Sequence, residues 1–185
     1  SAAWPAPVLL VAPKDRAVLD DAERRGEEIR IEVSGAYKRN VSGRNIVGRL
    51  DRGKGKWIVV STPVTSWFTS TCERGPGIAG FLAIARHAVR LLPDVDLMFV
   101  ATAGHEIGHG GMEHFMKDGA PPPAATLAWA HFGSSLACRD TVVRAINSSA
   151  SLASRVDRNF AAIDGMRLSG ERAAIGELRE VHAAG

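Results

Sequence analysis

The sequence contains little cysteine, few aromatic residues and no long apolar segment. Its two cysteines, Cys72 and Cys138, are too few for a disulfide-rich scaffold, and we expect two buried thiols. They neither establish nor exclude an oxidising compartment. The longest apolar runs, such as residues 97–101, are far shorter than the roughly 18 residues that a membrane-spanning helix needs. The sequence therefore predicts no membrane span.

The sequence also lacks a strong excess of charge of either sign. The 23 Lys and Arg residues are nearly balanced by 20 Asp and Glu residues, and the two signs are interleaved along the chain. A nucleic-acid binder usually carries a basic stripe, so this pattern argues against a nucleic-acid partner. Since 45% of the 185 residues are hydrophobic, the chain can bury a core of its own.

The first third of the sequence alternates short elements. A buried strand is predicted for the apolar run 8–12, and a helix over 15–25 is predicted to end at Gly26. The alternating residues 29–33 predict a half-exposed strand. Two further strands, 45–50 and 57–61, are separated by a Gly-rich and charged loop that predicts a hairpin.

The central part of the sequence favours an α/β fold. Apolar residues recur at helical spacing over 78–92, where Pro93 ends the pattern, and a continuous apolar strand follows over 96–102. A second apolar strand is predicted over 126–132, and we expect it to be an inner strand of a parallel sheet, together with 57–61 and 97–102. A helical pattern returns over 175–181. We expect three layers, with a mostly parallel central sheet and helices on both of its faces.

A His-rich and Gly-rich segment, residues 104–114, follows the strand 96–102 and contains three of the six histidines. Ligands bind at the carboxyl ends of strands in open α/β sheets, so this position predicts a site. Read as His105-Glu106-x-x-His109, the segment matches the zincin motif, in which a helix presents two zinc ligands and the glutamate activates water. Its glycines are poor helix formers and weaken that interpretation.

Several motifs in order resemble the di-zinc aminopeptidase family, family twenty-eight of the metallopeptidases. They are Arg44-Asn45-Ile46-Val47-Gly48-Arg49-Leu50, the strand 57–61, Cys72-Glu73-Arg74-Gly75-Pro76-Gly77, and the strand 97–102 followed by His105-Glu106-Ile107-Gly108. The resemblance implies a zinc-exopeptidase-like fold for residues 41–185, as a partial catalytic domain. Residues 1–40 resemble the end of a protease-associated insert, and the family favours a secreted or periplasmic location.

The resemblance also assigns roles to individual residues. Pro63 and Thr65 stand where the family has a His and an Asp ligand, so that half-site is lost. The remaining ligand positions fall on Glu73, Glu106 and His131, with His109 as an added ligand. His105 takes the position of the general base, and Arg74 and Trp67 lie in the loop that borders the substrate. One zinc ion is expected rather than two.

Three hypotheses follow from these observations. The first is a metal-dependent hydrolase that acts on a peptide or amide bond through a rebuilt metal site. The second is a non-catalytic relative that keeps the fold for binding or assembly. The third is the zincin-type metalloprotease. The resemblance further implies that the chain lacks the C-terminal part of the family's catalytic domain, as a fragment or a processed chain would. Whether a second chain supplies that part stays open.

Overall fold

The computed structural model describes residues 9–36, 38–67, 69–133, 136, 143–146, 150–163, 165–168 and 174–185. The chain divides into two compact units, Ser1–Val41 and Ser42–Gly185. None of the helices in these described ranges is long and apolar enough to cross a membrane.

The first unit contains a short 3-10 turn, Pro13–Asp15, and helix α1, Arg16–Arg25. Gly26 ends α1 in the left-handed conformation, at φ 66°, as the sequence predicts. The strands predicted over 8–12 and 29–33 are wrong for the described residues, which form no strand there and are exposed. An alternating pattern makes a stable strand only beside a partner strand, and the described part of this unit offers none.

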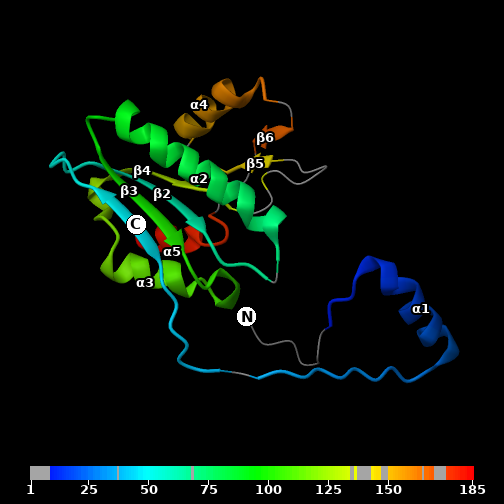
Figure 1. Ribbon diagram of the computed structural model, residues 1–185. Coiled ribbons are helices and arrows are strands. Elements are labelled where there is room, and N and C mark those ends of the chain that lie inside the picture. The colour runs from blue at the N-terminus through cyan, green and yellow to red at the C-terminus, as the bar shows by residue number, and fades with distance from the viewer. Residues whose placement is uncertain are drawn as a thin grey trace. The chain divides into compact units, whose positions relative to one another are not determined.

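A four-stranded sheet organises the second unit in the order β1-β3-β2-β4 (Figure 1). Its strands are β1 Ile46–Leu50, β2 Trp57–Pro63, β3 Asp96–Thr102 and β4 Thr126–His131. Strand β2 pairs in parallel with both β3 and β4, whereas β1 pairs antiparallel with β3. This architecture confirms the predicted α/β fold with a mostly parallel sheet.

Two details of the predicted sheet are wrong. The strands β1 and β2 do not form a hairpin, because β3 inserts between them and pairs with both. Strand β4 is not an inner strand: it lies at the edge of the described sheet, and Leu127 is 58% exposed. Proximity in sequence favours a hairpin, but the apolar β3 is buried only when strands cover both of its edges.

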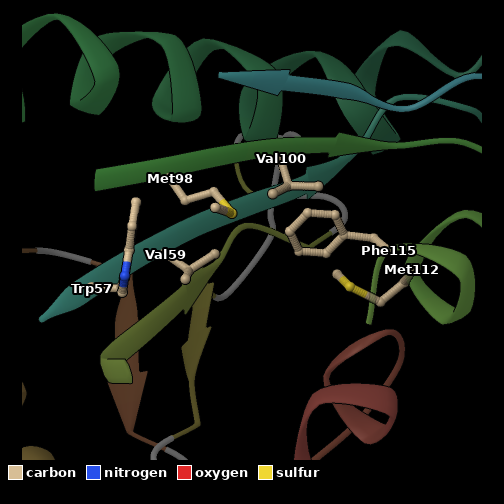
Figure 2. Packing of buried hydrophobic residues seen from close by; sticks show 6 residues of the cluster. All are labelled: Trp57, Val59, Met98, Val100, Met112 and Phe115. Atoms are coloured by element: carbon tan, nitrogen blue, oxygen red, sulfur yellow. The ribbon is translucent and has the colours of Figure 1, made fainter. Parts of the chain in front are cut away.

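Helices cover both faces of this sheet. Helix α2, Thr71–Leu91, packs on one face, and α3, Gly110–Asp118, lies with α5, Leu178–Ala183, on the other (Figure 1). Side chains alternate between the two faces, so the core on the α3 face consists of Trp57, Val59, Met98, Val100, Met112 and Phe115 (Figure 2). A smaller cluster under α2 consists of Val60, Phe81 and Ala101.

Helix α2 begins at Thr71, although the apolar periodicity predicts a start at Ile78 and a loop before it. Its first turns include Pro76, which lacks the N–H of a normal helical hydrogen bond. Contact with the sheet outweighs this low propensity, because Gly77 brings the helix close to the ends of β2 and β4. A Cβ atom at Gly77 would lie only 2.8 Å from the carbonyl oxygen of Gly133. Residues 73 and 74 are thereby held on a helix at the strand ends.

The described residues of this unit form five further elements. They are the 3-10 turns His105–Ile107 and Pro123–Ala125, the parallel pair β5 Val143–Ala145 and β6 Met166–Leu168, and helix α4 Ala150–Phe160.

Candidate functional site

Polar side chains gather at the carboxyl ends of β2, β3 and β4, on the face that α3 and α5 cover. Ser61, Thr102 and His131 belong to the same alternating series as the core residues of that face. Ser61 and Thr102 are fully buried, so their hydroxyl groups require partners within the protein. These partners are the imidazole of His131 and the carboxylate of Glu177.

His131, predicted as a metal ligand, is held by a buried serine. Its Nδ1 lies 2.8 Å from Oγ of Ser61, and the indole Nε1 of Trp129 donates to the same oxygen at 2.7 Å. Burial lowers the pKa of His131 to about 4, and the positive charges of His105, Arg74 and His109 act in the same direction. His131 is therefore a neutral imidazole at neutral pH.

The turn after β3 is built from residues in the left-handed conformation. Gly104 and Gly108 have φ angles of 74° and 93°, and His109, which is not a glycine, has φ 60°. The backbone at Gly111 passes close to Ala103: a Cβ atom added at Gly111 would lie 2.2 Å from the carbonyl oxygen of Ala103. Asn45 fixes this turn, because its side-chain amide donates to the carbonyl oxygen of Gly111 and accepts from the N–H of Ala103.

This turn removes the basis of the zincin interpretation. His105 lies on a 3-10 turn, whereas His109 is the residue before α3, and Gly108 separates the two elements. The zincin motif needs both histidines on one face of a single helix, which this segment does not form. Gly108, one of the glycines that weaken the motif in the sequence, adopts the left-handed conformation and interrupts the helix between the two histidines.

Two histidines of the turn pair with carboxylates at α5. Nδ1 of His105 lies 3.2 Å from Oε1 of Glu177, and Nδ1 of His109 lies 3.4 Å from Oε1 of Glu180. The two imidazole rings are neighbours, with centroids 5.0 Å apart. Glu177 also accepts a hydrogen bond from the hydroxyl of Thr102 at 2.7 Å. Since a carboxylate only accepts hydrogen bonds, Nδ1 of His105 carries the proton and Nε2 is its basic nitrogen.

A second group centres on Arg74, which is only 5% exposed. Its Nη2 lies 2.9 Å from a carboxylate oxygen of Glu73 and 2.9 Å from one of Glu106, and its Nε donates to the carbonyl oxygen of Thr65. The hydroxyl of Thr65 donates to the other oxygen of Glu106 at 2.8 Å. Burial alone would raise the pKa of Glu106, but the hydrogen bonds from Arg74 and Thr65 outweigh burial and lower it. Glu106 is therefore ionised at neutral pH.

The predicted substrate residues have different surroundings. Trp67 is 59% exposed, and its carbonyl oxygen accepts a hydrogen bond from the hydroxyl of Ser70. The guanidinium of Arg74, by contrast, contacts groups of this chain. Substrate contact by either residue stays a prediction.

The predicted ligands lie in the same region but do not surround one point. Arg74 joins Glu73 to Glu106, and His105 lies beside His109, while His131 is bound to Ser61. Within the described residues, no three His, Cys, Asp or Glu side chains are grouped so that they could hold a metal ion. The donor types suit zinc, but their present spacing does not fit it.

Sequence reasoning missed the two glutamates behind the histidines. Glu177 and Glu180 fall between the apolar positions of the predicted helix 175–181, where a solvent-facing residue is normally expected. Glu177 is nevertheless fully buried. Its partners, Thr102 and His105, are more than seventy positions away, so no local pattern could have revealed it.

The expectation of buried free thiols is wrong for Cys72. This residue is disulfide-bonded and exposed, immediately before Glu73 on α2. The other cysteine of the chain, Cys138, lies outside the described residues. A disulfide-bonded sulfur is no longer a reactive thiol, so it does not need burial to protect it.

The chain resembles solved structures but no protein family model. No protein-family model matches the sequence, and no curated protein matches it. The structure resembles that of a Zn-dependent exopeptidase from Parabacteroides distasonis, with a TM-score of 0.55 and 12% sequence identity. The match covers 76% of this chain but only 60% of the exopeptidase chain. At this identity the likeness shows the fold: the chain has the α/β fold of a zinc exopeptidase, whereas membership of the di-zinc aminopeptidase family stays a prediction.

Proposed function

We propose that this chain is a hydrolase that acts on a peptide or amide bond, with His105 as its general base. The observation that carries the proposal is the pairing of His105 with a fully buried glutamate at the carboxyl end of β3. The side chain of His105 is 24% exposed, so its imidazole reaches solvent while the carboxylate of Glu177 does not. A carboxylate behind an imidazole orients the ring and stabilises its protonated form.

The chemistry assigned to His105 is proton transfer. Its Nε2 accepts a proton from a water molecule as the water oxygen attacks the carbonyl carbon. The same nitrogen then returns the proton to the leaving amine nitrogen when the carbon–nitrogen bond breaks. Glu177 is a positioning residue, because it acts through His105 and is shielded from solvent. Zinc has no assigned step, because the described donors do not fit it in their present arrangement.

The test is hydrolysis of a panel of aminoacyl and peptidyl p-nitroanilides by the purified chain, assayed with a chelator and with added zinc. His105→Ala should lower kcat by a factor of about 10² to 10⁴, the usual cost of losing a general base. His114→Ala is the matched control, because His114 lies on α3 with a 75% exposed side chain. Glu177→Gln should lower kcat and leave KM near the wild-type value.

Activity that survives His105→Ala unchanged would contradict the proposal. So would a wild-type chain that hydrolyses nothing on the panel under either metal condition. A change in KM alone for Glu177→Gln would instead indicate a structural effect on the substrate pocket.

A second candidate function is the non-catalytic relative, and one observation favours it. The guanidinium of Arg74 pairs with both of the carboxylates, Glu73 and Glu106, that the family resemblance assigns to the metal. A scaffold with this arrangement keeps its fold without a metal. Complete absence of turnover on the panel, together with unchanged folding of His105→Ala, is the result expected of this candidate.

The proposal includes a secreted or periplasmic location. The disulfide bond at Cys72 supports it, because disulfides persist mainly in oxidising compartments.

A further inference from the structure

We infer that the guanidinium of Arg74 takes the place of a metal cation between Glu73 and Glu106, and that this pair of carboxylates excludes zinc in the native protein. The inference does not depend on hydrolysis, since it concerns which cation the carboxylates hold.

The guanidinium of Arg74 lies where two carboxylates share one cation. A single nitrogen, Nη2 of Arg74, lies 2.9 Å from Oε1 of both Glu73 and Glu106. Two carboxylates that share one cationic centre are an arrangement that metal sites also use. Here the shared centre is covalently part of the chain.

Both carboxylate oxygens of Glu106 already accept a hydrogen bond. One oxygen accepts from Arg74, and the other accepts from the hydroxyl of Thr65. Thr65 is fixed in turn, since its hydroxyl oxygen accepts the backbone N–H groups of Gly104 and His105 at 3.1 and 3.3 Å. A zinc ion that binds Glu106 would have to compete with these donors for the charge of the carboxylate.

Burial strengthens the pairing of Arg74 with Glu106. The side chain of Arg74 is 5% exposed and that of Glu106 is 9% exposed, so water screens their charges weakly. A divalent cation next to the buried guanidinium would meet strong repulsion, because the arginine stays protonated throughout the physiological pH range. The guanidinium also has a third anchor, the carbonyl oxygen of Thr65 at 2.7 Å from its Nε, which opposes its displacement.

The test measures zinc binding by isothermal titration calorimetry, confirmed by metal analysis after gel filtration. Arg74→Met removes the charge while keeping an apolar chain of similar length, and it leaves both carboxylates without their cation. We expect Arg74→Met to bind zinc at least tenfold more tightly than the wild type does. The double variant Arg74→Met, Glu106→Gln should lose that gain.

Arg86→Met is the matched control, because Arg86 lies on the same helix and is exposed. It should bind zinc as the wild type does. Equal zinc affinity of Arg74→Met and the wild type would overturn the inference.

A second measurement keeps the inference testable if Arg74→Met does not fold. In the otherwise native chain, Glu106→Gln should leave zinc affinity within a factor of two of the wild-type value, because Glu106 is not a zinc ligand there. A wild-type zinc site that weakens tenfold or disappears in Glu106→Gln would show that the carboxylates already bind metal, and would overturn the inference.

Discussion

His131 is a buried base whose charge state differs between the folded and unfolded chain. Its pKa falls from 6.5 to about 4 on folding, because burial and the nearby positive charges oppose protonation. Between these two pH values the unfolded chain takes up a proton that the folded chain rejects. The stability contributed by neutral His131 is therefore present above about pH 6.5 and is lost as the pH falls towards 4.

We predict that this loss is visible in urea unfolding. Between pH 7 and pH 4.5, the free energy of unfolding of the wild type should fall by about 2 kcal/mol more than that of His131→Gln, which has no imidazole to protonate. Other groups titrate similarly in both proteins, so the difference between them isolates His131. Equal losses in the two proteins would show that the imidazole is not protonated in this range on unfolding.

The sequence predicted the candidate site in part. The position of His105 and Glu106 after β3 followed from a buried strand with a glycine-rich turn behind it, and the structure has both features. The partners of these two residues did not follow. The predicted place of Arg74 beside the substrate stays a prediction, but the sequence did not indicate that its guanidinium lies between two carboxylates. A buried arginine must find acceptors within the protein. Burial of this kind depends on tertiary contacts, which no local pattern encodes.

At the scale of a single element, the close approach of α2 to the sheet depends on one glycine, Gly77. Gly77 allows the helix to approach Thr62 and Gly133, where a Cβ atom would lie 3.3 Å from the threonine hydroxyl and 2.8 Å from the carbonyl oxygen. Gly80, one turn further along the same helix, meets only the ring of Phe132 at 3.4 Å, which is an ordinary contact.

We therefore predict that substitution by alanine has opposite effects on stability at Gly77 and at Gly80. Gly80→Ala should stabilise the protein by up to about 1 kcal/mol, because alanine favours the helix. Gly77→Ala should destabilise it by about 1 to 3 kcal/mol, since the added methyl group forces the helix away from the strand ends. Urea unfolding of both variants gives the two signs directly, and stabilisation by Gly77→Ala would refute the described approach of α2 to the sheet.

Helices and strands were predicted best where an apolar periodicity extended over many residues or an apolar run was continuous. Strands β2 and β3 were predicted from apolar runs, and they lie side by side as parallel strands. The start of α2 was missed, because Gly75, Pro76 and Gly77 are normally typical of a loop. The hairpin of β1 and β2 was also wrong, since loop composition gives no information on which strand lies alongside. Helix propensity and turn signals are local properties of the sequence. The start of α2 and the partner of β1 depend instead on contacts with the sheet.

For the whole molecule, the disulfide at Cys72 is the covalent constraint to test. With two cysteines in the sequence, one disulfide within the chain leaves no thiol free. We predict that iodoacetamide adds no mass to the denatured, unreduced monomer, whereas it adds two carbamidomethyl groups after reduction. Alkylation of the unreduced monomer would contradict the disulfide.

The insertion of β3 between β1 and β2 has a consequence for how the chain folds. Ile46 pairs with Ala101, and Leu50 pairs with Leu97. Strand β1 therefore pairs with a strand that lies about fifty residues further along the chain. Strand β2 meets the same partner through the intervening α2, and these two strands can form their parallel pair without β1. Long-range pairing closes a large loop and slows folding. Strand β4 is further still, because Ile58 of β2 pairs with Ala128, about seventy residues along the chain. We therefore expect the central pair of β2 and β3 to form first, and the two edge strands β1 and β4 to dock onto it afterwards.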